Sequence, residues 1–161
     1  ARRLSAATAA SRWRMEVTTT SDGVTVVNDA YNANPESVLA ALDAVAAMAR
    51  ATADRPARRS WAVLGEMLEL GAASHEEHEA AGRAAAERGF AHVVAVGPGA
   101  IGVATGAEGV AGATVVSAVD STEAAARLLR EQVREGDVVL VKASRGSGLE
   151  TVAQALTEVT Q

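Results

Sequence analysis

The sequence contains no cysteine, which excludes both a disulfide framework and a metal site built on thiolates. Aromatic residues are also scarce: two Trp, one Tyr and one Phe among 161 residues. The core must therefore be built from Val, Leu and Ala, whose small side chains suit helices lying close on a sheet. No apolar run reaches the roughly 20 residues that a membrane-spanning helix needs, and no signal peptide opens the chain.

Positive charge is not concentrated anywhere in the sequence. The net charge is −5 and Lys and Arg form no long run, which argues against a nucleic-acid surface. Hydrophobic residues make up 48% and charged residues 22%, as in a globular domain. We expect residues 1–13 to be a linker or the end of a preceding domain, and residues 14–161 to form one domain of a longer protein.

Strand-like and helix-like segments alternate along the chain. Residues 15–19 and 24–28 read as strands joined by a hairpin turn at 21–23. Further strands are expected at 61–64, 92–96, 114–117 and 138–141, with helices between them and a last helix from 149. Such repeats with continuous apolar strands predict an α/β fold. We expect a doubly wound, Rossmann-like sheet of about six strands, mostly parallel, with one antiparallel strand from the hairpin.

Several helix ends carry capping signals. Asn34 is a good N-cap, and Pro35 suits the first helical position. Ser74 and Glu77 have the spacing of a capping box, and Gly89 that of a left-handed C-cap. Asp120 or Ser121 is expected to cap the helix that follows.

The first candidate site lies at the end of the second strand. Asp29, Tyr31, Asn32 and Asn34 gather there, and ligands of open α/β sheets bind at the carboxyl ends of strands. An ordinary turn would explain Asn34 and Pro35, but four polar or aromatic groups in six positions exceed what a helix cap requires. The pattern favours a binding site.

The second candidate is the loop after the last strand, residues 142–148. Lys142 and Arg145 bring two positive charges, with Ser144 and glycines around them, which suits a carboxylate or a phosphate. A Gly-rich turn with solvated cations explains the loop equally well. Arg14 precedes the first strand, where it could pair with Asp29 or reach a phosphate.

Residues 97–102 match the G-x-G-x-x-G pattern of dinucleotide-binding folds and follow a strand. Asp120 even lies near the position of a ribose-binding carboxylate. We expect Gly106 and Gly109 to interrupt the following helix within two turns, however, and the match falls on the fourth strand instead of opening the fold. A stand-alone nucleotide-binding or regulatory module is therefore the alternative hypothesis, and a purely structural interaction domain is a third.

His75 and His78 are spaced i, i+3, whereas metalloprotease helices use i, i+4. Because glutamates surround them, we expect a solvated helix start and no metal site. The sequence also lacks a G-x-x-x-x-G-K-[ST] phosphate loop and a G-x-S-x-G nucleophile elbow. If this protein acts on a nucleotide, we therefore expect the triphosphate cradle to lie outside this chain.

Three separated motifs carry a family resemblance: residues 28–35, residues 64–71 with His78 and Gly82 behind them, and residues 142–146. With these motifs the chain resembles the C-terminal domain of the Mur ligases, most closely the branch that adds D-alanyl-D-alanine. The resemblance extends from about residue 11 onward. Two positions depart from the family pattern, which usually has Asp where Glu66 stands and Gly where Ala143 stands.

The resemblance implies part of a cytoplasmic, ATP-dependent amide ligase of peptidoglycan synthesis. Such an enzyme joins D-alanyl-D-alanine to a UDP-linked muramoyl tripeptide through an acyl phosphate. In the family, earlier domains hold the phosphate loop, the Mg²⁺ ligands and most of the UDP-substrate site. The C-terminal domain closes over ATP and brings the incoming amino compound. The resemblance therefore implies that this fragment holds no catalytic residue and is inactive alone.

The resemblance also assigns roles to the candidate residues. Arg14 would reach the nucleotide phosphates and Asp29 the ribose. Asn32, with Tyr31 and Asn34 near it, would contact the nucleoside or the dipeptide. The loop with Lys142, Ser144 and Arg145 would face the dipeptide.

Overall fold

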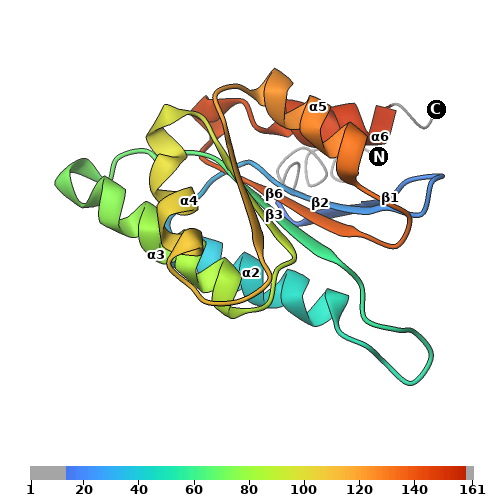
Figure 1. Ribbon diagram of the computed structural model, residues 1–161. Helices are drawn as coiled ribbons and strands as arrows, with labels where there is room; N and C mark the ends of the chain where they lie inside the picture. Colours follow the sequence, from blue (N-terminus) through green and yellow to red (C-terminus); the bar gives the residue numbers. More distant parts are fainter. Residues whose placement is uncertain (1–13, 159–161) are drawn as a thin grey trace, which may run out of the picture.

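The computed structural model describes residues 14–158, which form a six-stranded sheet with helices on both faces (Figure 1). The predicted linker, residues 1–13, lies outside the described residues. The strands are β1 (Glu16–Thr19), β2 (Thr25–Asp29), β3 (Ser60–Leu64), β4 (His92–Val96), β5 (Val115–Val119) and β6 (Val138–Lys142). The helices are α2 (Pro35–Ala49), α3 (Ser74–Glu87), α4 (Ile101–Glu108), α5 (Thr122–Gln132) and α6 (Glu150–Glu158), with 3₁₀ turns η1 (Gly71–Ala73), η2 (Pro98–Ala100) and η3 (Arg145–Ser147).

The strand order is β1-β2-β6-β3-β4-β5. β1 pairs antiparallel with β2, and the other four pairs are parallel. The prediction of a mostly parallel sheet with one antiparallel strand from the hairpin is therefore confirmed. β6, the last strand of the chain, lies between β2 and β3, so that Lys142 is in register with both Asp29 and Leu64.

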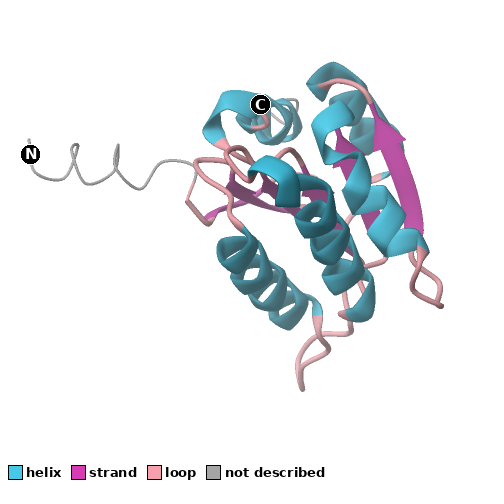
Figure 2. Ribbon diagram, turned by 90° about the vertical axis from the view of Figure 1, so that its left-hand side faces the viewer, coloured by secondary structure: helices cyan, strands magenta, loops and turns pink. Residues whose placement is uncertain are grey.

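Two hydrophobic cores form, one on each face of the sheet. α2, α3 and α4 pack on one face and α5 and α6 on the other, as Figures 1 and 2 show from two sides. Along β6, Val138 and Leu140 enter the first core while Val139 and Val141 enter the second. Burial on both faces explains why this strand is continuously apolar.

This arrangement creates a switch point in the middle of the sheet. The loops after β2 and β3 lead to helices on one face, whereas the loop after β6 leads to α6 on the other. Adjacent loops therefore diverge at the carboxyl edge of the sheet, the geometry that opens a ligand-binding crevice in α/β folds.

The helix caps are confirmed at Asn34 and Ser121, whose side chains accept hydrogen bonds from the first turns of α2 and α5. Asn34 and Ser37 form a reciprocal capping box that the sequence analysis missed. The capping box predicted at Ser74 and Glu77 is wrong. Because η1 runs directly into α3, Ser74 already has helical dihedral angles (φ −53°, ψ −51°) and no side chain caps this helix.

α3 and α4 pack unusually closely through glycines. A Cβ atom at Gly82 would overlap the carbonyl oxygen of Val103, and one at Gly106 would overlap that of Glu79. The expected interruption is wrong at Gly106, through which α4 continues, but confirmed at Gly109, the C-cap that follows the last helical residue, Glu108. Here the absence of a side chain at glycine lets the two helices approach each other closely.

Across residues 14–158, every helix is too short or too polar to traverse a lipid bilayer.

Candidate functional site

Asp29 and Lys142 form a nearly buried ion pair at the switch point. Lys142 Nζ lies 2.6 Å from Asp29 Oδ2 and also donates to the carbonyl oxygen of Asn32 at 2.9 Å. The other carboxylate oxygen, Oδ1, accepts from the backbone N–H of Met15 at 2.9 Å. The Lys142 side chain is 2% exposed and that of Asp29 11%. The pair thus ties the ends of β2 and β6 together and fixes the orientation of the Asp29 carboxylate.

Tyr31 lies close to two arginines. The guanidinium carbon of Arg14 is 4.1 Å from the centre of the tyrosine ring, and that of Arg145 is 5.6 Å away. Both distances are within the range of cation–π contacts. Among the residues the structure describes, Arg14 contacts this ring and makes no ion pair with Asp29, whose charge Lys142 neutralises. Two exposed arginines therefore contact one aromatic ring at the carboxyl edge.

Ser144 is buried and joins three loops. Its backbone N–H donates to the carbonyl oxygen of Glu66 at 3.0 Å. Its Oγ accepts from the N–H of Leu68 at 2.9 Å and donates to the carbonyl oxygen of Ala33 at 3.4 Å. The loops after β2, β3 and β6 are therefore held as one unit.

The two asparagines are engaged differently. The Asn34 side chain accepts from the N–H of Ser37 at 2.8 Å and is used by the helix cap. The Asn32 side chain is exposed, while its carbonyl oxygen holds Lys142. Of the eight sequence-predicted residues, four are exposed (Arg14, Asn32, Asn34 and Arg145), Tyr31 is half-buried beside the two arginines, and Asp29, Lys142 and Ser144 are buried.

His78 is fully buried, so the expectation of a solvated helix start is wrong for this residue. Its Nε2 accepts from the N–H of Met67 at 2.9 Å, and its Nδ1 donates to the carbonyl oxygen of Ser74 at 2.6 Å. These two bonds require the neutral ring with the proton on Nδ1. The helical spacing of His78 with the buried Ala81 and Ala85 was the signal that could have revealed it.

His75, by contrast, is exposed and pairs with Glu79 one turn along the helix. Within residues 14–158, no group of three or more His, Asp or Glu side chains is arranged to hold a metal ion.

The space beside the glycine-rich turn at residues 97–102 is filled by a side chain of the protein itself. A Cβ atom at Gly99 would overlap the carboxyl group of Glu66, which lies against this turn. A dinucleotide fingerprint needs free backbone approach to a pyrophosphate at this point. Since a carboxylate would repel that group, the geometry disfavours the alternative of a stand-alone dinucleotide-binding module.

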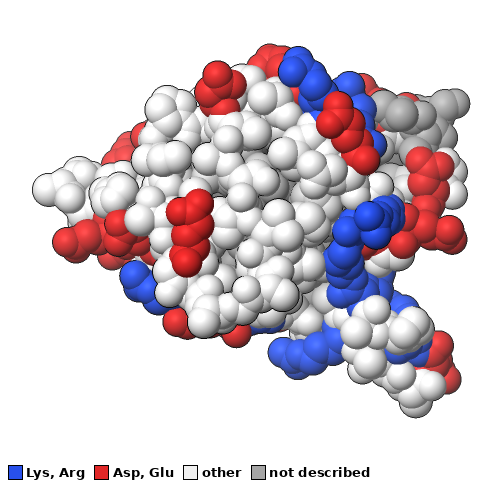
Figure 3. All heavy atoms as spheres, viewed as in Figure 1, with Lys and Arg blue, Asp and Glu red and all other residues white. Residues whose placement is uncertain are grey.

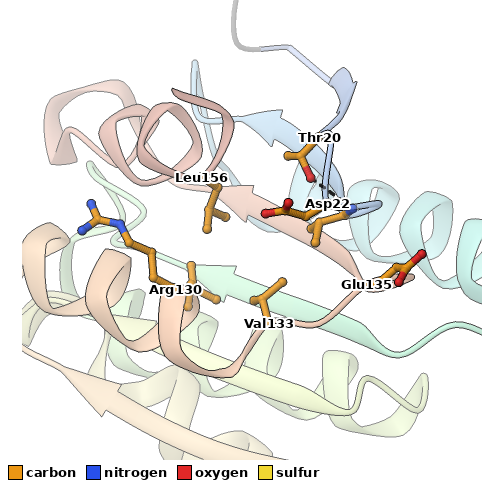
Figure 4. A pocket seen from close by; sticks show the side chains of 8 residues that line it. Thr20, Asp22, Arg130, Val133, Glu135 and Leu156 are labelled. Atoms are coloured by element: carbon orange, nitrogen blue, oxygen red, sulfur yellow. Dashed lines mark hydrogen bonds between the residues drawn. The ribbon is translucent and has the colours of Figure 1, made fainter. Parts of the chain in front are cut away.

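Two hollows lie at the opposite, amino edge of the sheet. The first is formed by Val133, Leu156 and neighbouring apolar side chains, with Asp22, Arg130 and Glu135 around it (Figure 4). The second lies under the loop at residues 51–59 and is rich in arginine. Neither hollow includes a residue of the predicted site.

Comparison with known proteins identifies the family. Residues 13–145 match the family model described as "Mur ligase, glutamate ligase domain". The UDP-N-acetylmuramoyl-tripeptide–D-alanyl-D-alanine ligase of Mycobacterium tuberculosis is 47% identical over 167 residues, covering 95% of this chain and 32% of the relative. That of Bacillus subtilis is 30% identical over 145 residues, covering 90% and 30%. The chain thus spans about a third of the length of these curated relatives.

Solved structures agree with this assignment. The MurF ligase from Thermotoga maritima, in complex with ADP, superposes with a TM-score of 0.69 at 31% identity, covering 91% of this chain and 30% of that one. MurF from Acinetobacter baumannii gives a TM-score of 0.72 at 28% identity, covering 90% and 30%. The family match, the sequence identities and the fold together show that the chain belongs to the Mur ligases and is a Mur ligase C-terminal domain.

Proposed function

We propose that this chain is the part of an ATP-dependent ligase that closes over the nucleotide while D-alanyl-D-alanine is joined to UDP-N-acetylmuramoyl-tripeptide. The observation that carries the proposal is the 47% identity, over 95% of the chain, to a ligase of that name. Because the chain spans about a third of that relative, the phosphate loop, the Mg²⁺ ligands and the UDP-substrate site are assigned to the remaining domains. The proposed setting is the cytoplasm.

The residues at the switch point fit a nucleotide. Arg14 has no carboxylate partner within residues 14–158, so its guanidinium group can meet phosphate oxygens. The fixed Asp29 carboxylate can accept hydrogen bonds from ribose hydroxyls, and the exposed Asn32 amide and Tyr31 are placed beside it for the nucleoside. We assign these four contacts to ATP or to the neighbouring dipeptide.

The loop after β6 is assigned to the dipeptide side. Lys142 and Ser144 keep this loop in place through their bonds to Asp29 and Leu68. Arg145 is exposed next to them and is the residue we assign to a substrate carboxylate. Asn34 supports the adjacent loop by capping α2.

Closure of this domain has a chemical purpose in the proposed reaction. ATP would supply the phosphoryl group for an acyl phosphate, which water destroys unless the site is shielded. The domain supplies a lid and part of the charged site. The chain alone is therefore expected to form no amide bond, and ATP-dependent amide formation by the isolated chain would contradict the proposal.

A chimera tests the proposal directly. The matching segment of the Mycobacterium tuberculosis ligase is replaced by this chain, and phosphate release is measured with ATP, the muramoyl tripeptide and D-alanyl-D-alanine. We expect release that requires both substrates. Arg14→Gln and Arg145→Gln should each lower kcat/KM by about tenfold or more, since each removes a charged hydrogen-bond donor.

The control variant is Arg83→Gln, an exposed change on α3. It should leave the rate unchanged. A chimera that folds but releases no phosphate, or arginine variants as active as the control, would contradict the proposed function.

A further inference from the structure

Four arginines line the second hollow at the amino edge of the sheet. This arginine hollow lies between the loop at residues 51–59 and the turn that precedes β6. Figure 3 shows blue side chains gathered around the base of the loop that projects at the lower right of Figure 1. Its charged residues are Arg55, Arg58, Arg59, Arg134, Glu135 and Asp137. Positive charge thus exceeds negative charge here, in a chain whose net charge is −5.

Arg58 is held rigidly by acceptors that carry no charge. Its Nε donates to the carbonyl oxygen of Gly136 at 2.6 Å. Its Nη2 donates to Thr25 Oγ1 at 2.6 Å and to the carbonyl oxygen of Asp137 at 3.2 Å. Within residues 14–158 it forms no ion pair, and its Nη1 group donates no hydrogen bond. The guanidinium is therefore ordered before any ligand arrives and keeps free donors.

One of the two carboxylates that line the hollow, that of Asp137, is already held by other donors. It accepts three hydrogen bonds from Arg59 at 2.7–3.2 Å, one from Trp61 Nε1 at 2.9 Å and one from the N–H of Arg134 at 2.9 Å. Burial would raise the pKa of Asp137, but these hydrogen bonds outweigh it and lower the pKa. Asp137 therefore neutralises Arg59.

The remaining groups leave Arg58 without a counter-ion. Burial lowers the pKa of Arg58, the charge of Arg55 lowers it further, and Asp137 only partly offsets them. Arg55 and Arg134 are exposed, and neither makes an ion pair among the described residues. The carbon chain of Glu135 lies against Gly23: a Cβ atom added at Gly23 would be 2.8 Å from Glu135 Cγ.

We propose that the arginine hollow is an anion-binding site for a phosphate group, separate from the switch point at the carboxyl edge. Arg58 would supply an ordered guanidinium, and Arg55 and Arg134 would close on the phosphate from either side. Guanidinium groups bind phosphate oxygens through paired N–H donors, and three of them match a dianion better than a single carboxylate.

The test is an NMR titration of the ¹⁵N-labelled chain with inorganic phosphate at constant ionic strength and a pH at which phosphate is largely dianionic. We expect saturable, one-to-one shifts at the Arg58 Nε–H and at the amides of residues 134–137. Arg134→Gln should weaken binding about tenfold, because one charged donor is lost. The Arg134 side chain is exposed, so the fold should be unchanged.

The matched control is Arg127→Gln, an exposed arginine of α5 that does not line the hollow. It should leave the affinity unchanged. Equal weakening by both variants, or shifts that never saturate, would reduce the effect to general charge attraction and overturn the proposal. Shifts confined to residues 29–32 would also overturn it, and would leave the nucleotide site of the proposed function standing.

Discussion

At the scale of single residues, Lys142 shows how one buried charge depends on another. Its side chain is 2% exposed, with Asp29 as counter-ion. Lys142→Met keeps the length of the side chain but leaves the Asp29 carboxylate without its partner. Removal of one member of a buried pair is strongly destabilising. We expect the free energy of unfolding to fall by about 3 kcal/mol, as measured by urea denaturation.

A double-mutant cycle controls this prediction. Asp29→Asn combined with Lys142→Met removes both charges, and the double variant should be less destabilised than the sum of the two single variants. Strict additivity would mean that the two side chains do not interact, which would contradict the geometry.

His92 gives the chain a pH dependence of stability. Its ring stacks on Trp61 with centroids 3.7 Å apart, and burial, followed by the charge of Arg59, lowers its pKa below 6.5. Between the folded and the unfolded pKa, the unfolded chain binds the proton more readily. The contribution of neutral His92 to the free energy of unfolding is therefore complete above about pH 6.5. It decreases as the pH falls toward the pKa that His92 has in the folded chain.

His92→Phe tests that contribution, because it keeps a ring on Trp61 and removes the titrating group. Urea denaturation at pH 7.5 and 5.5 should show a smaller loss of stability in the variant than in the parent chain. Equal losses would assign the pH dependence to other groups.

At the scale of elements, the contact between α3 and α4 depends on missing side chains. In Gly106→Ala the new Cβ atom would overlap the carbonyl oxygen of Glu79, so the helices must move apart. We expect a loss of about 1–3 kcal/mol in urea denaturation, typical of overpacking. Gly109→Ala is the matched control, since its nearest atom lies at 3.4 Å and its φ is −71°. A control as damaging as Gly106→Ala would refute the packing explanation.

The loop between β3 and α3 depends on His78. His78→Leu preserves the volume approximately but leaves the buried N–H of Met67 without an acceptor, a cost of about 1–3 kcal/mol. Hydrogen exchange at the Met67 amide should accelerate accordingly. His75→Leu removes only an exposed pair and should change stability by less than about 1 kcal/mol. Unchanged exchange at Met67 would show that His78 does not hold the loop.

At the scale of the whole molecule, local patterns were sufficient for the architecture. Alternation and apolar runs located all six strands, and the Asn34–Pro35 pair located the start of α2. Features that depend on distant neighbours were missed. The sequence around Gly106 reads as a helix breaker because the backbone of Glu79 across the helix contact is not visible in it.

The candidate site was predicted in the same uneven way. The sequence predicted that Asp29, Tyr31, Lys142 and Arg145 lie at the carboxyl ends of two strands. It did not predict that they meet, because that depends on the pairing of β2 with β6. The division of tasks among them was not predicted either, because it depends on which partner is nearest once the sheet forms. Lys142 pairs with Asp29 and Ser144 binds Leu68, two contacts that span over 70 positions in the chain.

The position of β6 between β2 and β3 has a consequence for synthesis. The ribosome synthesises the chain from its amino end, so β6, a central strand of the sheet, is the last of the six strands to emerge. Until then β2 and β3 have no strand between them, and neither core has its residues from β6. A chain that ends at residue 136 should therefore lack the cooperative unfolding transition of the parent, as seen by circular dichroism. In a nascent chain the edges of β2 and β3 that face β6 stay unpaired until β6 is made, and chaperones that bind exposed strands would act in that interval.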